Sequence, residues 1–141
     1  MSGTVTVYQL LAADAGIRAL LPVSGVSPPQ LAAGTLAQNV ALPWIAINRI
    51  SSSDRETVSP GSDRLVTERV QVTFAARNYD AIEALDRAIK LACADKRPVV
   101  AGISDVKVHT APGGADALSA SGQFTLRTRD FLVRYLEATA S

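Results

Sequence analysis

A pair of neighbouring strand patterns limits what this chain can fold into more than any other feature. The second pattern, from Val66 to Ala76, alternates between two sets of side chains. Because side chains of a strand point to its two faces in turn, the alternation predicts one buried face and one wet face. The first pattern, Trp44 to Ile50, follows Pro43, a residue that strands tolerate at their start. In the second pattern the apolar set is Val66, Val70, Val72, Phe74 and Ala76, and the polar set is Thr67, Arg69, Gln71 and Thr73.

The segment between these strands predicts a long polar hairpin arm rather than a two-residue turn. Residues 51–64 begin with serines and charged residues and then contain Pro60-Gly61. Acidic and basic side chains are interleaved here, which suits ion pairing with a partner better than acid–base catalysis. The plain alternative is that these charges are only solvated. The candidate contact residues of this arm are Asp54, Arg55, Glu56, Asp63 and Arg64.

The N-terminal region combines helical spacing with a long connection. Apolar residues from Val7 to Leu21 recur at helical intervals, interrupted in the middle. We therefore expect two short helical pieces, with Asp14 as the cap of the second. Residues 23–41, which contain Pro28-Pro29, predict an irregular connection of unusual length. Connections this long are commonly functional or mobile.

A third helix is expected after the first two strands. It begins after the cap residue Asn78 and ends near Asp95, before Pro98. Its apolar stripe faces the core, whereas its opposite face is charged. The stripe contains Ile82, Leu85 and Ile89, and the charged face offers ion pairs four residues apart, Glu83 with Arg87 and Asp86 with Lys90.

The C-terminal third predicts two further strands. One is formed by the segments Val99 to Ile103 and Val106 to Thr110, and the other runs from Phe124 to Leu136. In the last strand the apolar residues change from even to odd positions, so we expect a bulge or bend near residues 127–130. Arginines in a strand need anionic partners or open solvent, and Asp130 is a local candidate. Arg127 and Arg129 join the candidate contact residues.

These elements together predict an α+β fold in the order α-β-β-α-β-β. A mainly antiparallel sheet would be covered on one face by helices. The length of 141 residues and the apolar content of 48% fit a single domain spanning residues 1–141.

Little in the sequence points to catalysis. Acidic and basic residues balance to a net charge of +1, which disfavours sequence-independent binding of a polyanion. The chain has one histidine, His109, and one cysteine, Cys93, so ligand spacing for zinc is missing. No nucleophile elbow or phosphate-binding glycine loop occurs, and no apolar run is long enough to span a bilayer. We therefore expect no catalytic, cofactor or metal site, and no enzymatic activity.

The order of the parts resembles the tail-terminator, or tail-completion, proteins of long-tailed phages and gene transfer agents. The resemblance covers nearly the whole chain apart from residues 23–41 and 112–121. It is carried by the N-terminal helical region, Leu42-Pro43-Trp44-Ile45, Arg69-Val70-Gln71-Val72, Tyr79-Asp80-Ala81, and the closing Arg129-Asp130-Phe131 with Val133 and Tyr135.

The resemblance implies a structural virion protein of the tail or neck, assembled in the host cytoplasm. Its copies would form a homohexameric ring that caps the tail tube, ends tube polymerisation and meets the head–tail connector or stopper protein. DNA would pass through the lumen without specific binding, and no membrane would be involved. No residue is carried over as a catalytic or ligand site.

Other functions stay open at this point. The first is another phage neck or head-completion component, which would also be oligomeric and non-enzymatic. The second is a small α+β binding domain or an enzyme that uses carboxylates alone. A third is an RNA-binding module, which the lack of paired exposed aromatic residues on the strands disfavours.

Overall fold

The computed structural model describes residues 2–21, 31–33, 43–56, 64–111, 117–118 and 124–137. The N-terminal half of the chain contains α1 (Ser2–Ala13), α2 (Ala15–Leu20), β1 (Leu31–Ala33), β2 (Trp44–Glu56) and β3 (Arg64–Ala76). The C-terminal half contains α3 (Tyr79–Cys93), β4 (Ile103–Ala111), β5 (Ala117–Leu118) and β6 (Thr125–Glu137).

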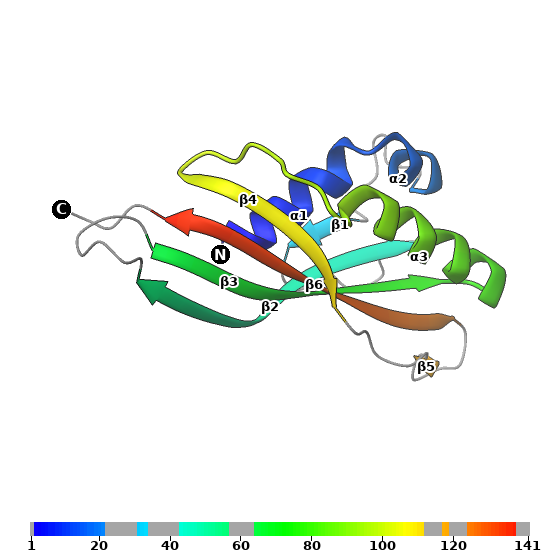
Figure 1. Cartoon of the computed structure of the whole chain (residues 1–141). Coiled ribbons are helices and arrows are strands. Elements are labelled where there is room, and N and C mark those ends of the chain that lie inside the picture. The colour runs from blue at the N-terminus through cyan, green and yellow to red at the C-terminus, as the bar shows by residue number, and fades with distance from the viewer. Residues whose placement is uncertain are drawn as a thin grey trace.

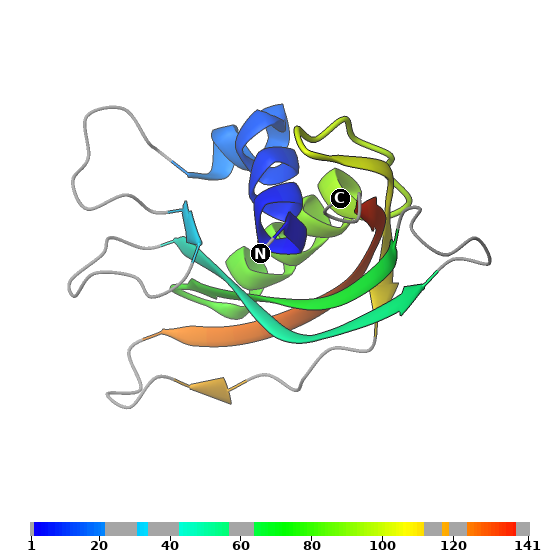
Figure 2. The same ribbon diagram turned by 90° about the vertical axis from the view of Figure 1, so that its left-hand side faces the viewer.

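One sheet organises the molecule. Its strands lie in the order β1-β2-β3-β6-β4, and the short β5 pairs with one end of β6. The pairs β2–β3, β3–β6 and β4–β6 are antiparallel, whereas β1 lies parallel to β2. All three helices lie on the same face of this sheet (Figures 1 and 2). The predicted α+β class, with helices on one face of a mainly antiparallel sheet, is confirmed.

The core lies between the helices and the inner face of the sheet. The apolar set predicted on β3 is buried throughout, and its polar set faces the side that carries no helix. The last strand and the helices complete the core. They contribute Phe131, Val133 and Tyr135 from β6, Val7 and Leu11 from α1, Ile17 from α2, and Ile82, Leu85 and Ile89 from α3.

Both predicted helix caps are present. The carboxylate of Asp14 accepts a hydrogen bond from Ile17 N at 3.0 Å, which separates α1 from α2. The amide oxygen of Asn78 accepts one from Ala81 N at 2.8 Å and begins α3. Each cap satisfies a backbone donor that the first helical turn leaves without an intrahelical partner.

The predicted bulge near residues 127–130 is wrong. β6 pairs with β3 in one unbroken register, from Thr125 opposite Ala76 to Glu137 opposite Arg64. The sheet instead shifts register elsewhere, between Arg49 and Ser51 of β2 and between Ser104 and Lys107 of β4. The change of apolar phase in β6 therefore has another cause, which lies in the contacts of its arginines.

The hairpin strands are longer than their apolar patterns. β2 continues to Glu56 and β3 begins at Arg64, so much of the predicted arm is paired strand, and residues 57–63 lie outside the described part. Leu31–Ala33 forms β1 within the segment expected to be irregular. In the part of the chain that the structure describes, no helix combines the length and apolar character needed to cross a bilayer.

Candidate functional site

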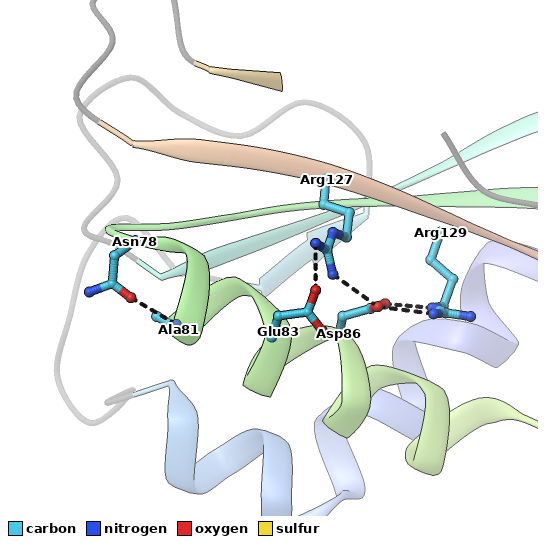
Figure 3. A network of polar contacts seen from close by, with 6 residues as sticks. All are labelled: Asn78, Ala81, Glu83, Asp86, Arg127 and Arg129. Carbon is cyan, nitrogen blue, oxygen red and sulfur yellow. Dashed lines mark hydrogen bonds and ion pairs between the residues drawn. The ribbon is translucent and has the colours of Figure 1, made fainter. Parts of the chain in front are cut away.

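Two arginines of β6 form a network of ion pairs with α3. Arg129 binds the Asp86 carboxylate through two hydrogen bonds, Nε to Oδ1 at 2.6 Å and Nη2 to Oδ2 at 3.0 Å. Arg127 donates to Asp86 Oδ2 at 3.2 Å and pairs with Glu83 Oε1 at 2.8 Å. Figure 3 shows both guanidinium groups directed from the strand toward the helix. We call these four residues the α3–β6 cluster.

The cluster explains the change of apolar phase along β6. Odd-numbered residues of this strand face the helices throughout, because the register with β3 is continuous. In the C-terminal part these positions hold Phe131, Val133 and Tyr135, whereas in the N-terminal part they hold the two arginines. The strand is therefore uniform, and ion pairs replace apolar packing at one end of its inner face.

The electrostatics of the cluster favour the charged forms of Glu83, Asp86 and Arg129. Burial alone would raise the pKa of Asp86, but hydrogen bonds from Arg129 and the charges of Arg129 and Arg127 outweigh it and lower the pKa. Hydrogen bonds from Arg127 and Tyr79 lower the pKa of Glu83. Both carboxylates are thus held as anions and are poorly suited to exchange protons near neutral pH.

Three local pairings expected from the sequence are replaced by contacts across the fold. Asp130 is not the partner of Arg127 or Arg129, because it lies on the opposite face of β6 and binds Arg69 Nε at 2.7 Å. Glu83 and Asp86 pair with β6 rather than with the residues four positions further along α3. A flanking strand presents two fixed guanidinium groups, which compete well with flexible side chains on the same helix.

A buried carboxylate on β3 is the polar residue that the sequence analysis missed. Glu68 is 1% exposed and faces the helices, where its Oε2 accepts from Gly3 N at 2.8 Å and its Oε1 from the Tyr135 hydroxyl at 2.7 Å. A Cβ at Gly3 would collide with this carboxylate, so glycine allows the close approach. The signal was available, because residue 68 falls on the apolar side of the β3 alternation.

Four of the predicted contact residues of the arm, Asp54, Arg55, Glu56 and Arg64, lie at one end of the β2–β3 hairpin. The backbone of Asp54, Arg55 and Glu56 pairs with Val66, Leu65 and Arg64 in turn, and the side chain of Arg64 is exposed. The side chains of residues 54–56, and the whole of Asp63, lie outside the described part. The structure thus brings the backbone of Asp54, Arg55, Glu56 and Arg64 together, and it places Arg127 and Arg129 on the inner face of the sheet.

The remaining candidate groups offer little chemistry. His109 shares the outer face of β4 with Lys107, opposite the buried Val106 and Val108. Burial raises the pKa of the Cys93 thiol to about 12, which keeps it protonated and unreactive. Across the described ranges, no group of three or more His, Cys, Asp or Glu residues could hold a metal ion.

Comparison with known proteins gives the family. The model of the family described as "Tail completion protein gp17" matches residues 5–131. The chain belongs to this family. The match spans α1 through most of β6 and so includes the arm and the α3–β6 cluster.

A solved structure agrees with the fold of this tail completion family member. A chain from the "Virion of native gene transfer agent (GTA) particle" matches with a TM-score of 0.66 at 17% sequence identity. The match covers 92% of this chain and 91% of that chain, so the similarity extends over the whole domain. No curated protein matches the sequence.

Proposed function

We propose that this protein is a non-enzymatic tail completion subunit whose copies form a hexameric ring on the end of the tail tube. The ring ends tube polymerisation and presents a surface to the head–tail connector or stopper protein. The observation that carries this proposal is the family match over residues 5–131, which leaves little of the domain for another function. The similarity to a chain of the gene transfer agent virion agrees with it.

The hairpin arm is the proposed contact with neighbouring molecules. The β2–β3 hairpin end extends beyond the helix layer, which supports a contact between this end and another subunit (Figure 1). A closed ring uses two different surfaces of each subunit, and a projecting arm supplies one of them. The proposed contact residues of the arm are Asp54, Arg55, Glu56, Asp63 and Arg64.

Arg127 and Arg129 complete the proposed contact set in a different way. Their side chains remain 12% and 24% exposed although both are paired with α3. The α3–β6 cluster thus forms a partly exposed polar surface of alternating sign, which can meet a charged neighbour without leaving an unpaired buried charge.

The assembled ring would be part of the virion tail or neck, formed in the host cytoplasm. DNA would pass through its lumen without base-specific contacts. With 14 basic and 13 acidic residues, the subunit has no large excess of positive charge that would hold the phosphates in place.

Charge reversal in the arm tests the ring. The double variant Arg55→Glu/Arg64→Glu should stay folded but lose assembly, because like charges would then face each other across the contact. Light scattering measures the mass in solution, and negative stain after mixing with tail-tube protein shows whether tubes are capped. The matched control is Arg87→Glu on the exposed face of α3. If the double variant assembles as the wild type does, the arm does not contribute to the subunit contact.

A further inference from the structure

The two edges of the sheet differ in how their outward backbone groups are hydrogen-bonded. On the β4 edge, the backbone of Val108 is already satisfied, since its N–H donates to Lys96 O at 3.0 Å and its C=O accepts from Asp95 N at 2.9 Å. The segment that follows α3 therefore covers this edge at Val108 and prevents a new strand from pairing at that position. Among the described residues, only β1 covers the opposite edge, and it does so over three positions.

Beyond Ile47, β3 is the only described strand that pairs with β2. The parallel strand β1 pairs with Ile45, Ala46 and Ile47, and no other described strand lies beside the rest of β2. The extra residue of the register shift is Ile50, which is 51% exposed. A bulge redirects a side chain, and here it leaves a large apolar one on an open edge. Such an edge is a template for pairing with another extended segment.

The segment on the covered edge is itself unpaired on its outer side. The backbone groups of Arg97 to Val99 have no hydrogen-bond partner among the described residues, and Val99 is 97% exposed. Pro98 fixes its own backbone torsion and lacks a donor, which is compatible with pairing at an edge. This segment precedes β4, so it lies on the side of the sheet opposite β2 (Figure 1).

We infer that Asn48–Ser52 of one copy pairs with Arg97–Val99 of a neighbouring copy, with Ile50 and Val99 packed together. This contact rests on the proposed ring and specifies one of its interfaces. It joins two different surfaces on opposite sides of the subunit, and such head-to-tail contacts close into a ring when the rotation permits. The contact would cover two exposed apolar side chains and would pair outer backbone groups that have no partner among the described residues.

Two charge substitutions test this contact separately and together. Ile50→Asp and Val99→Asp should each reduce the assembled mass to that of a single subunit in light scattering. An equal mixture of the two variants should form a dimer that grows no further. The Ile50→Asp variant keeps an intact Val99 surface, and the Val99→Asp variant keeps an intact Ile50 surface. These two intact surfaces can pair once, and no further subunit can then bind. Both residues are exposed, so circular dichroism should show a native fold and melting temperature.

The controls are Ile50→Val and Val99→Ile, which keep an apolar side chain and should assemble as the wild type does. If either Asp variant still forms rings of the wild-type mass, this contact is wrong, but the proposed ring is not contradicted. A mixture that remains monomeric would also overturn it. A wild-type chain that stays monomeric with and without tail-tube protein would remove the proposed ring and this contact together.

Discussion

The two carboxylates between the sheet and the helices, Glu68 and Asp86, are stabilised in opposite ways. Glu68 is 1% exposed and accepts hydrogen bonds from a backbone N–H and a tyrosine hydroxyl. Asp86 has a side chain that is 14% exposed, and its donors are two guanidinium groups. Each side chain joins two elements: Glu68 links β3 to α1 and β6, and Asp86 links α3 to β6.

The type of donor and the depth of burial together determine how much stability is lost when each carboxylate is removed. The donor at Gly3 belongs to the first turn of α1, where free N–H groups and the helix dipole favour a negative charge. These donors are neutral, and at such depth water cannot replace a lost acceptor. Asp86 lies nearer the surface, so water can partly solvate its arginines when the carboxylate is removed. Loss of Glu68 should therefore cost more than loss of Asp86.

The largest effect is expected for Glu68→Ala. This variant leaves the Gly3 N–H and the Tyr135 hydroxyl without this acceptor and opens a cavity, so it should lower the free energy of unfolding by about 4 kcal/mol. Urea unfolding followed by circular dichroism measures the change. Glu68→Gln, which keeps one acceptor oxygen, should lose less. A loss below about 1 kcal/mol in the Ala variant would show that α1 does not depend on this carboxylate.

Asp86→Ala should have an intermediate effect. Hydrogen bonds to charged groups are involved, so we expect a loss of about 2 kcal/mol in the free energy of unfolding. The matched control on the same helix is Lys90→Ala, whose exposed side chain should contribute less than about 0.5 kcal/mol. A double-mutant cycle with Arg129→Ala should show strong coupling. Additive losses would mean that the bidentate pair is not a stabilising unit.

The features that the sequence predicted correctly depend on neighbouring residues. The alternation in β3 identified the buried face because the strand period acts over a few positions. The caps Asp14 and Asn78 were found for the same reason, since each binds an N–H three residues further on. The α+β class follows from the order of such local patterns.

The features that it did not predict depend on residues far apart in the chain. Arg129 and Asp86 are 43 positions apart, and Glu68 and Gly3 are 65 apart. Charged residues on the inner face of a strand interrupt its apolar alternation. The two arginines of β6 therefore gave this strand the pattern of a bulged strand, although its register is continuous. The partners of Arg127 and Arg129 depend on the packing of α3 on β6.

The contribution of the α3–β6 cluster to the free energy of unfolding should depend on pH. The native pKa of Asp86 is lowered, so its contribution is present above the ordinary aspartate pKa of about 4 and is lost as the pH falls through the native value. The stability difference between the wild type and Asp86→Ala should therefore be largest near pH 7 and narrow at low pH. Urea unfolding at a series of pH values measures it. Leu91→Ala, which changes an exposed apolar residue of α3, should show a difference that is independent of pH. A constant difference for Asp86→Ala as well would mean that its carboxylate contributes through packing rather than through its charge.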